Sequence, residues 1–205
     1  MDDWWSEAIK LEFESQDGGS YTGGLYRGVI HTTEVKNYNP STKTYYGHHN
    51  PPHFTLTMHV NGKETGPRIY QHFPISRAAR ALENHKAGVE TNRRSAIQIE
   101  IAWKAAEVAD LPVAMLGRLW DWMGWVQHQT DIKSIAPAFG GPEAAGTASP
   151  TRMSGADWDA FNGWCGHQHV PENAHWDPGK LDISSKLFRV KRPGSPLVCQ
   201  VSDWF

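Results

Sequence analysis

The sequence predicts a single α/β domain in which helices flank a central mixed β-sheet. With 205 residues, 39% of them hydrophobic, the chain is long enough to bury one sizeable core. Short apolar and β-branched runs at 25–33, 53–60 and 96–103 have the length of strands, and the last two alternate as strands do. Residues 112–129 instead carry apolar side chains at helical spacing. Strands separated by helices or long loops, with some hairpin character, are typical of a mixed sheet with helices packed against it.

The first part of the chain supplies a strand, a long loop and a hairpin. The run LYRGVIHTT at 25–33 ends in polar residues and predicts a buried strand. Residues 34–52 are polar and aromatic and rich in Asn, Pro, Gly and Tyr, which predicts a long loop. The strand at 53–60 is followed by Asn61-Gly62, a favoured hairpin turn, so that 68–73 can pair back as the next strand.

The middle of the chain supplies two predicted helices and one strand. Ser76 is a suitable N-cap for a short helix at 77–83. In the strand at 96–103 (AIQIEIAW), three isoleucines face one side and Glu100 lies on the other. The clearest helix is 112–129, whose predicted core stripe comprises Val113, Leu116, Leu119, Trp120, Met123 and Val126.

The last third of the chain is predicted to contain mostly loops with short regular elements. In order, we expect a loop rich in Gly, Pro and Ala at 135–155, a short strand at 164–170, a polar loop at 171–179 and a short helix at 181–187 capped by Asp182. Residues 1–190 would then form the folded domain, and 191–205 a C-terminal tail or the stub of a linker.

Composition and charge argue against some classes of function. Lys and Arg number 20 against 22 Asp and Glu, so the formal net charge is −2, whereas a general nucleic-acid binder usually has a basic excess. The short basic cluster at 186–192 is better explained as a solvated surface. No apolar run approaches the ~20 residues that span a bilayer, and the acidic start lacks the features of a secretory signal. We therefore expect no nucleic-acid partner and no membrane insertion.

Cysteine and tryptophan content leaves two alternatives open. Cys165 and Cys199 are no disulfide framework in a chain of this length. Cys165 lies in an apolar stretch and is expected in the core, although the sequence also allows a bridge between the two. The ten tryptophans either pack in the core or line a carbohydrate groove, and core packing is the default for any one of them.

The candidate chemistry lies among the eleven histidines. His31 ends an apolar strand, where an imidazole needs a partner and most simply bonds to the backbone. The segment GHQHVPENAHWDPG at 166–179 holds three imidazoles and two carboxylates. On a strand His167 and His169 would share a face, and Asp177 precedes Pro-Gly, a turn that would fix its carboxylate. A solvated loop with a turn-capping aspartate is the plainer interpretation, but two imidazoles and a carboxylate also suit zinc with a position open for water.

Glu100 is the second carboxylate to consider. It lies inside an Ile-rich strand, where a charge is costly unless it is paired or used. It is therefore either an outward-facing strand residue or a general base with a raised pKa beside a metal-activated water molecule.

Taken together, these stretches resemble the type-2 N-acetylmuramoyl-L-alanine amidases, a family that includes phage amidase lysins, cytoplasmic anhydro-muropeptide amidases and peptidoglycan recognition proteins. The matching stretches are VIHTT at 29–33, AIQIE at 96–100, and Gly166-His167 followed by Asp177-Pro178-Gly179. They occur in the family's order and span residues from about 25 to 187. The last stretch is the most specific of them, and the glutamate strand is weak alone.

The resemblance implies a zinc ion at the strand ends of a mixed sheet, held by His31, His167 and Asp177. Glu100 matches the family's glutamate, which acts as a base towards water. His175 stands where relatives often place a lysine that stabilises the oxyanion, a task that a histidine performs only through an N–H. His169 stands where many relatives have an acidic residue, and we expect it to support a ligand rather than to compete for the metal.

The function implied by the resemblance is zinc-dependent hydrolysis of peptidoglycan at the amide bond between N-acetylmuramic acid and the L-alanine of the stem peptide. The alternatives are a non-catalytic peptidoglycan recognition module of the same fold and an unrelated domain with a structural zinc site. The presence of all three candidate ligands and of Glu100 favours the enzyme, and neither cysteine is spaced for a structural site. The expected setting is a monomeric, bacteriolytic phage-type endolysin, made in the host cytoplasm without a signal peptide and reaching the cell wall by holin-type release. A bacterial wall-recycling enzyme is the other setting.

Overall fold

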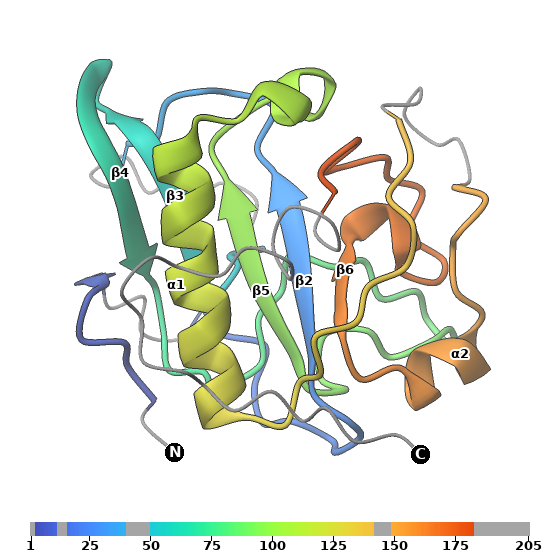
Figure 1. Cartoon of the computed structure of the whole chain (residues 1–205). Coiled ribbons are helices and arrows are strands. Elements are labelled where there is room, and N and C mark those ends of the chain that lie inside the picture. The colour runs from blue at the N-terminus through green and yellow to red at the C-terminus, as the bar shows by residue number, and fades with distance from the viewer. Residues whose placement is uncertain (1–2, 12–15, 40–49, 142–148, 183–205) are drawn as a thin grey trace, which may run out of the picture.

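A six-stranded mixed β-sheet organises the described part of this computed structural model, which comprises residues 3–11, 16–39, 50–141 and 149–182 (Figure 1). The strands are β1 (Ile9–Lys10), β2 (Arg27–Thr32), β3 (Phe54–Val60), β4 (Lys63–Gln71), β5 (Ala96–Ile101) and β6 (Trp164–Gly166). Their order across the sheet is β1-β4-β3-β5-β2-β6. β3 and β4 are antiparallel, and the other neighbouring strands are parallel. The prediction of one α/β domain with a mixed sheet is therefore confirmed.

The parallel strands β5, β2 and β6 place their carboxyl ends at one edge of the sheet. β2 pairs with β5 along its whole length, and this register sets His31 opposite Glu100. On the other side of β2, Gly28 pairs with Trp164 of β6. A Cβ atom at Gly28 would lie 2.1 Å from the indole ring of Trp164, so only glycine lets this ring cross the strand. These three strands carry the candidate site.

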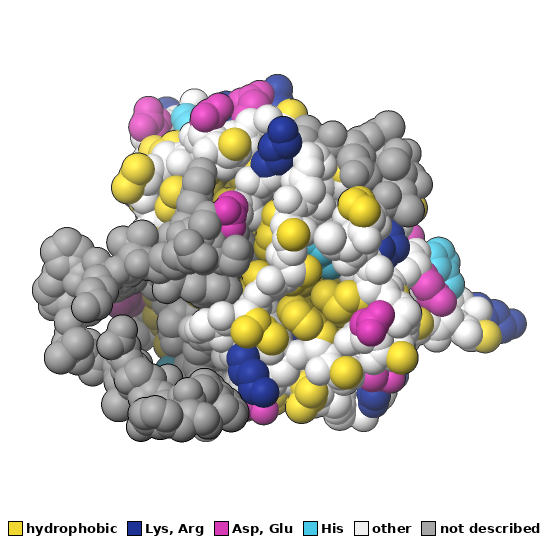
Figure 2. All heavy atoms as spheres, turned by 45° about the vertical axis from the view of Figure 1, so that its right-hand side comes forward, with side chains coloured by type: hydrophobic (Ala, Val, Ile, Leu, Met, Phe, Trp, Pro, Cys, Tyr) yellow, Lys and Arg dark blue, Asp and Glu magenta, His cyan; other side chains and the backbone are white. Residues whose placement is uncertain are grey.

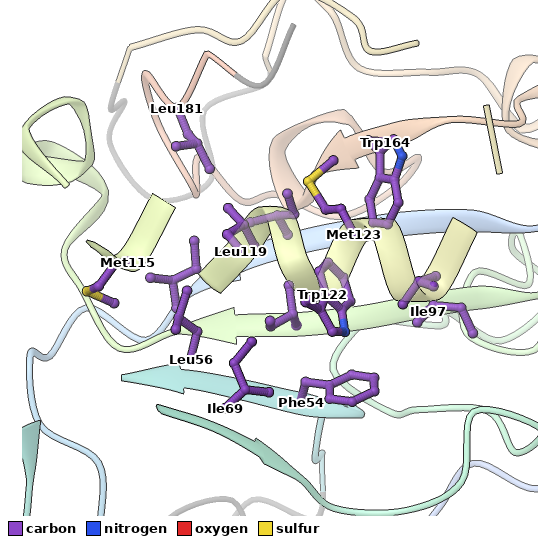
Figure 3. Packing of buried hydrophobic residues seen from close by; sticks show 14 of the residues in the cluster. Phe54, Leu56, Ile69, Ile97, Met115, Leu119, Trp122, Met123, Trp164 and Leu181 are labelled. Carbon is purple, nitrogen blue, oxygen red and sulfur yellow. The ribbon is translucent and has the colours of Figure 1, made fainter. Parts of the chain in front are cut away.

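Helix α1 (Val113–Gln129) covers one face of the sheet and completes the main hydrophobic core (Figure 1). Its buried side chains pack onto β3, β4 and β5, as Figure 3 shows for Trp122 beside Phe54. The Trp122 and Phe54 rings meet edge to face with their centroids 5.6 Å apart. The helix is as predicted, but Val113 is 84% exposed, so the core-facing side is rotated from the predicted stripe. The residues that α1 buries are Met115, Leu119, Trp122, Met123 and Val126.

The other face of the sheet is covered by loops and by the short helix α2 (Gly155–Ala160). Val29 of β2, Cys165 of β6 and Trp158 of α2 share a second hydrophobic cluster on this face. The prediction that Cys165 lies in the core is confirmed, and burial raises the pKa of its thiol to about 12. Cys199 lies outside the described residues, and so does any bridge to it.

Helix α2 is an element that the sequence analysis does not predict. It begins with a capping box: the Ser154 hydroxyl accepts from the Asp157 N–H at 3.2 Å, and the Asp157 carboxylate accepts from the Ser154 N–H at 3.2 Å. The Gly/Pro/Ala-rich loop predicted at 135–155 therefore ends at a short helix.

The predicted helix at 77–83 is wrong, because the backbone groups of this segment bond to other parts of the chain rather than to one another. The Leu82 N–H donates to Asn92 Oδ1 at 3.1 Å, and the Glu83 N–H donates to Asn173 Oδ1 at 2.7 Å. The segment is therefore an irregular loop that lies over the second face of the sheet.

Two strands begin or end at other residues than predicted. β4 begins at Lys63, earlier than predicted, and includes Pro67. A proline is tolerated there because β1 pairs only with the end of β4, which leaves its first part at an edge. β6 ends at Gly166, where the chain turns into a 3₁₀ helix, η3 (His167–His169), so the strand predicted at 164–170 is too long.

Some predictions concern residues outside the described part of the chain. They are much of the loop at 34–52, most of the helix at 181–187, the basic cluster at 186–192 and the tail at 191–205. None of the described helices has the length and apolar character needed to cross a membrane. On the face that Figure 2 shows, the described Lys and Arg side chains are scattered among Asp and Glu rather than gathered in a stripe.

Candidate metal centre

Three predicted ligands come together at the carboxyl ends of β2 and β6. His31 lies near the end of β2, His167 directly follows β6, and Asp177 lies on the loop beyond η3. His31 Nδ1 is 3.1 Å from His167 Nδ1 and 3.8 Å from Asp177 Oδ2, and His167 Nδ1 is 3.3 Å from Asp177 Oδ1. One ligand atom from each residue lies within 4.8 Å of the other two, and all three residues are buried. The cluster could therefore hold a metal ion.

Main-chain contacts fix the position of Asp177. Its Oδ2 atom accepts from the Thr32 N–H at 3.2 Å, and its carbonyl oxygen accepts from the Gln168 N–H at 2.8 Å. A Cβ atom at Gly166 would lie 2.4 Å from Pro178 Cδ, so this glycine lets the loop approach the end of β6 closely. Asp177 is thus tied both to β2 and to the turn that carries the second histidine.

Burial and neighbouring charges set the protonation states in the cluster. Burial lowers the pKa of His31 well below its ordinary range, and His167 lowers it further, against the opposite effect of Asp177. Burial alone would raise the pKa of the Asp177 carboxyl, but the three neighbouring imidazoles outweigh it and hold this pKa well below its usual range. At neutral pH a neutral His31 imidazole therefore faces an ionised carboxylate, and these are the protonation states in which both groups bind metals.

The donor set fits a divalent transition metal. Two imidazole nitrogens and one carboxylate oxygen are ligands of catalytic zinc, and the same trio serves in non-haem iron sites. The buried Nε2 atom of His31 has no hydrogen-bond partner among the described residues. The Nδ1 atoms of His31 and His167 face each other at 3.1 Å, a distance that needs a proton or a cation between the two lone pairs. The geometry thus accommodates a metal ion, and its chemistry allows zinc among others.

Glu100 lies beside His31 on the neighbouring strand. Its side chain is partly exposed, but its Oε2 atom is shielded from solvent and has no hydrogen-bond partner among the described residues. Burial, with further contributions from Asp177 and Glu34, raises the pKa of Glu100 well above its usual range. A carboxyl group in this environment is suited to take up a proton and to return it.

His175 stacks on one candidate ligand and lies beside another. Its ring is 3.9 Å from the His167 ring, centroid to centroid, with 12° between the planes. Its Nδ1 atom lies 3.4 Å from Asp177 Oδ1, and its Nε2 atom lies 3.7 Å from Glu83 Oε1. The hydrogen bond to Asp177, with the charges of both carboxylates, raises the pKa of His175 against the opposing effect of burial. The side chain is 37% exposed, so an N–H donor is presented at the edge of the cluster.

A cleft of about 360 Å³ opens onto these groups and brings Glu100 and His175 together with two of the ligands. Beside it lies a more polar hollow of about 460 Å³, which shares Asn50 and Leu82 with the cleft and has Arg80 and Arg93 on its walls. The cluster is therefore reached from an open cleft rather than sealed inside the protein. The lining of the cleft includes Thr32, Glu83, Glu100, His167, His175 and Asp177.

Among the described residues, no side-chain hydrogen bond joins His169 to any of the three candidate ligands. Its Nδ1 atom accepts from the Gly166 N–H at 2.8 Å, and its Nε2 atom donates to the Ala138 carbonyl at 3.1 Å. Burial lowers the pKa of His169 to about 4, so the ring stays neutral. Its contacts hold the turn from which His167 projects, so any support that it gives to the site passes through the backbone.

Two residues that shape the site are not predicted from the sequence. Asn173 is buried with its Oδ1 atom 2.9 Å from His167 Nε2, and Glu83 forms a wall of the cleft from within the segment predicted as a helix. Nothing in the local sequence shows that these two residues meet, because they lie 90 positions apart along the chain.

The structure thus brings together all five residues that the sequence analysis proposes for the site: His31, Glu100, His167, His175 and Asp177. Comparison with protein-family models, with curated proteins and with solved structures finds no match to this chain. The function of this protein therefore has to be inferred from its own sequence and from the geometry of the site.

Proposed function

We propose that this protein is a zinc-dependent amidase that cleaves peptidoglycan between N-acetylmuramic acid and the L-alanine of the stem peptide. The observation that supports the reaction class is the joint placement of a buried His-His-Asp cluster and the Glu100 carboxyl at one open cleft. Hydrolysis of an amide at a metal needs these parts: ligands, a proton acceptor and access for substrate. The choice of peptidoglycan rests on the resemblance of the motifs at residues 29–33, 96–100 and 166–179 to the type-2 amidases.

Each residue has a defined task in this proposal. His31, His167 and Asp177 would hold the zinc ion, which supplies Lewis-acid activation of water and of the scissile carbonyl. Glu100 takes a proton from the attacking water at its Oε2 atom and returns it to the leaving amine, for which its raised pKa suits it. His175 donates an N–H towards the oxygen on which negative charge develops.

The alternative within the same family is a recognition module that binds peptidoglycan without cutting it. Such modules typically lose a zinc ligand, whereas all three candidate ligands and Glu100 are present here. A structural zinc site is less favoured, because structural sites usually close with four protein ligands and this cluster opens onto a cleft.

The deciding experiment is digestion of purified peptidoglycan followed by mass spectrometry of the soluble products. An amidase releases free stem peptides and leaves the glycan strands intact. The wild-type protein should carry about one zinc ion per chain by elemental analysis, since three ligands and a water molecule complete a tetrahedral site. Full activity of metal-free protein would refute the mechanism, and cleavage within the glycan or within the peptide would refute the bond assigned.

Glu100→Gln separates catalysis from binding. The variant keeps the shape of the side chain and the three ligands, so zinc content and peptidoglycan binding should be unchanged. Cleavage should stop, and no stem peptides should appear in solution. Glu64→Gln is the matched control, because Glu64 is an exposed strand residue away from the cleft. A recognition module would behave differently: its wild-type form would bind peptidoglycan and release nothing.

A further inference from the structure

Asn173 is a fully buried amide between a candidate ligand and a wall of the cleft. Its Oδ1 atom accepts from the Glu83 N–H at 2.7 Å and lies 2.9 Å from His167 Nε2. Its Nδ2 group donates to the carbonyl oxygens of Glu83 at 3.0 Å and of Pro171 at 2.9 Å. Both donors and both lone pairs of the amide are therefore in use.

These contacts determine the orientation of the Asn173 amide, that is, the positions of its Oδ1 and Nδ2 atoms. The Glu83 N–H requires an acceptor, and the Glu83 and Pro171 carbonyls require donors. A flipped amide would set its NH₂ group against the Glu83 N–H and its oxygen against two other oxygens, so all three bonds would be lost. The oxygen atom therefore faces His167.

An acceptor facing His167 Nε2 fixes the proton of that imidazole. A 2.9 Å contact with a carbonyl oxygen requires an N–H on Nε2, and an imidazole that binds a metal carries no second proton. The Nδ1 atom then carries a lone pair, and Nδ1 is the atom that faces His31 and Asp177. A ligand that reached the cluster with its proton on Nδ1 would first have to move that proton.

We propose that Asn173 is a positioning residue that holds His167 in its Nε2–H form, with the Nδ1 lone pair directed into the metal site. The inference rests on the metal site of the proposed function but not on the reaction assigned to it. Because the same amide bonds both backbone groups of Glu83, it also joins the ligand to the wall of the cleft. Partners of this kind are commonly worth ten- to a hundredfold in metal affinity.

Asn92 provides a matched control, because it holds the same wall without touching a candidate ligand. Its Oδ1 atom accepts from the Leu82 N–H at 3.1 Å and from Gln98 Nε2 at 2.9 Å, and its Nδ2 group donates to the Leu82 carbonyl at 2.7 Å. Asn92→Ala and Asn173→Ala should therefore destabilise the same loop, but only the second should change His167.

The test combines two measurements on the full chain. Nitrogen-15 NMR of the metal-free protein reports which ring nitrogen of His167 carries the proton, and competition with a chromophoric chelator reports zinc affinity. We expect the Nε2–H form in the wild type, a mixture of both forms in Asn173→Ala, and a ten- to hundredfold loss of zinc affinity in that variant. Asn92→Ala should match the wild type in both measurements.

Asn173→Asp keeps the test decisive if the alanine variant fails to fold. Aspartate retains an oxygen facing His167 but sets its second oxygen against two carbonyls, so the Nε2–H form should persist while stability falls. A wild-type His167 with no proton on Nε2, or an Asn173→Ala variant that folds and keeps both the Nε2 proton and the zinc affinity, overturns the proposal. Neither measurement involves peptidoglycan, so a failed digestion with the expected tautomer would count against the reaction alone.

Discussion

Protonation of the buried His53 should lower the free energy of unfolding as the pH falls. His53 directly precedes β3 and is fully buried. Its Nδ1 atom accepts from the Gln98 N–H of β5 at 3.0 Å, and its Nε2 atom donates to the Arg77 carbonyl at 2.8 Å. A second proton, on Nδ1, would remove the bond to β5. Burial lowers the pKa of His53 from 6.5 to about 4, although the Arg77 carbonyl and Asp17 favour the charged form.

The sign and the size of the effect follow from these two pKa values. The unfolded chain binds the proton at higher pH than the folded protein. The contribution of neutral His53 to the free energy of unfolding is therefore complete above pH 6.5 and is lost as the pH falls to about 4. At about 1.4 kcal/mol per pKa unit, the gap amounts to about 3 kcal/mol. That is a large part of the stability of an ordinary domain, ~5–15 kcal/mol.

Urea unfolding of the wild type and of His53→Asn, at about pH 7.5 and about pH 4.5, measures this contribution. The asparagine oxygen still accepts from the Gln98 N–H but cannot titrate, so the variant should lose about 2.5 kcal/mol less than the wild type between the two pH values, most of the full difference. The other buried histidines titrate in both proteins, and among them His72 differs, because His53 contributes to lowering its pKa. His128→Asn, at an exposed position of α1, should keep the wild-type pH dependence. Equal pH dependence in the wild type and His53→Asn would refute the reasoning.

Further predictions concern the site and the sheet. Asp177→Ala should lose zinc and activity together, measured by elemental analysis and peptidoglycan digestion, because a site with three protein ligands has none to spare. His175→Ala should keep zinc and lose roughly 10²–10³ in kcat as one oxyanion donor is removed, and near-normal kcat would make it a loop residue only. His169→Ala should weaken zinc binding by about ten- to a hundredfold without abolishing it, measured by chelator competition. Gly28→Ala should lower the free energy of unfolding by at least about 1–3 kcal/mol in urea, because its Cβ would lie 2.1 Å from the Trp164 ring.

The elements that sequence predicted well are those with a strong local pattern. The alternation at 96–103 and the helical spacing at 112–129 each describe a surface with one buried side, and the sheet and α1 bury those sides. The candidate ligands could be predicted for a similar reason. His31 ends a buried strand, and the segment 166–179 has an unusually high local density of histidine and carboxylate side chains. The Ser154 and Asp157 capping box is likewise a local signal, and it marks the start of α2 in the sequence.

The features that sequence did not predict depend on partners far along the chain. The segment 77–83 has an adequate helix cap and composition, yet its amides bond to Asn92 and Asn173. A buried amide gains most of its free energy from such specific bonds, and a single sequence does not show which distant group supplies them. For the same reason Asn173 escaped notice inside the very segment that supplied two ligands and His175.

The hydrophobic core fixes the position of the proposed base, Glu100, relative to the candidate metal ligands. Ile97, Ile99 and Ile101 of β5 all face α1, and with a side-chain period of two this forces Glu100 to the opposite face. His31 lies on that face of β2, directly opposite Glu100 in the parallel register. A shift of β5 by one residue would bury the carboxyl among isoleucines and expose three of them to the cleft side, at a cost of several kcal/mol. The pattern that folds the sheet therefore also keeps the Glu100 carboxyl beside the cluster, without any direct bond between them.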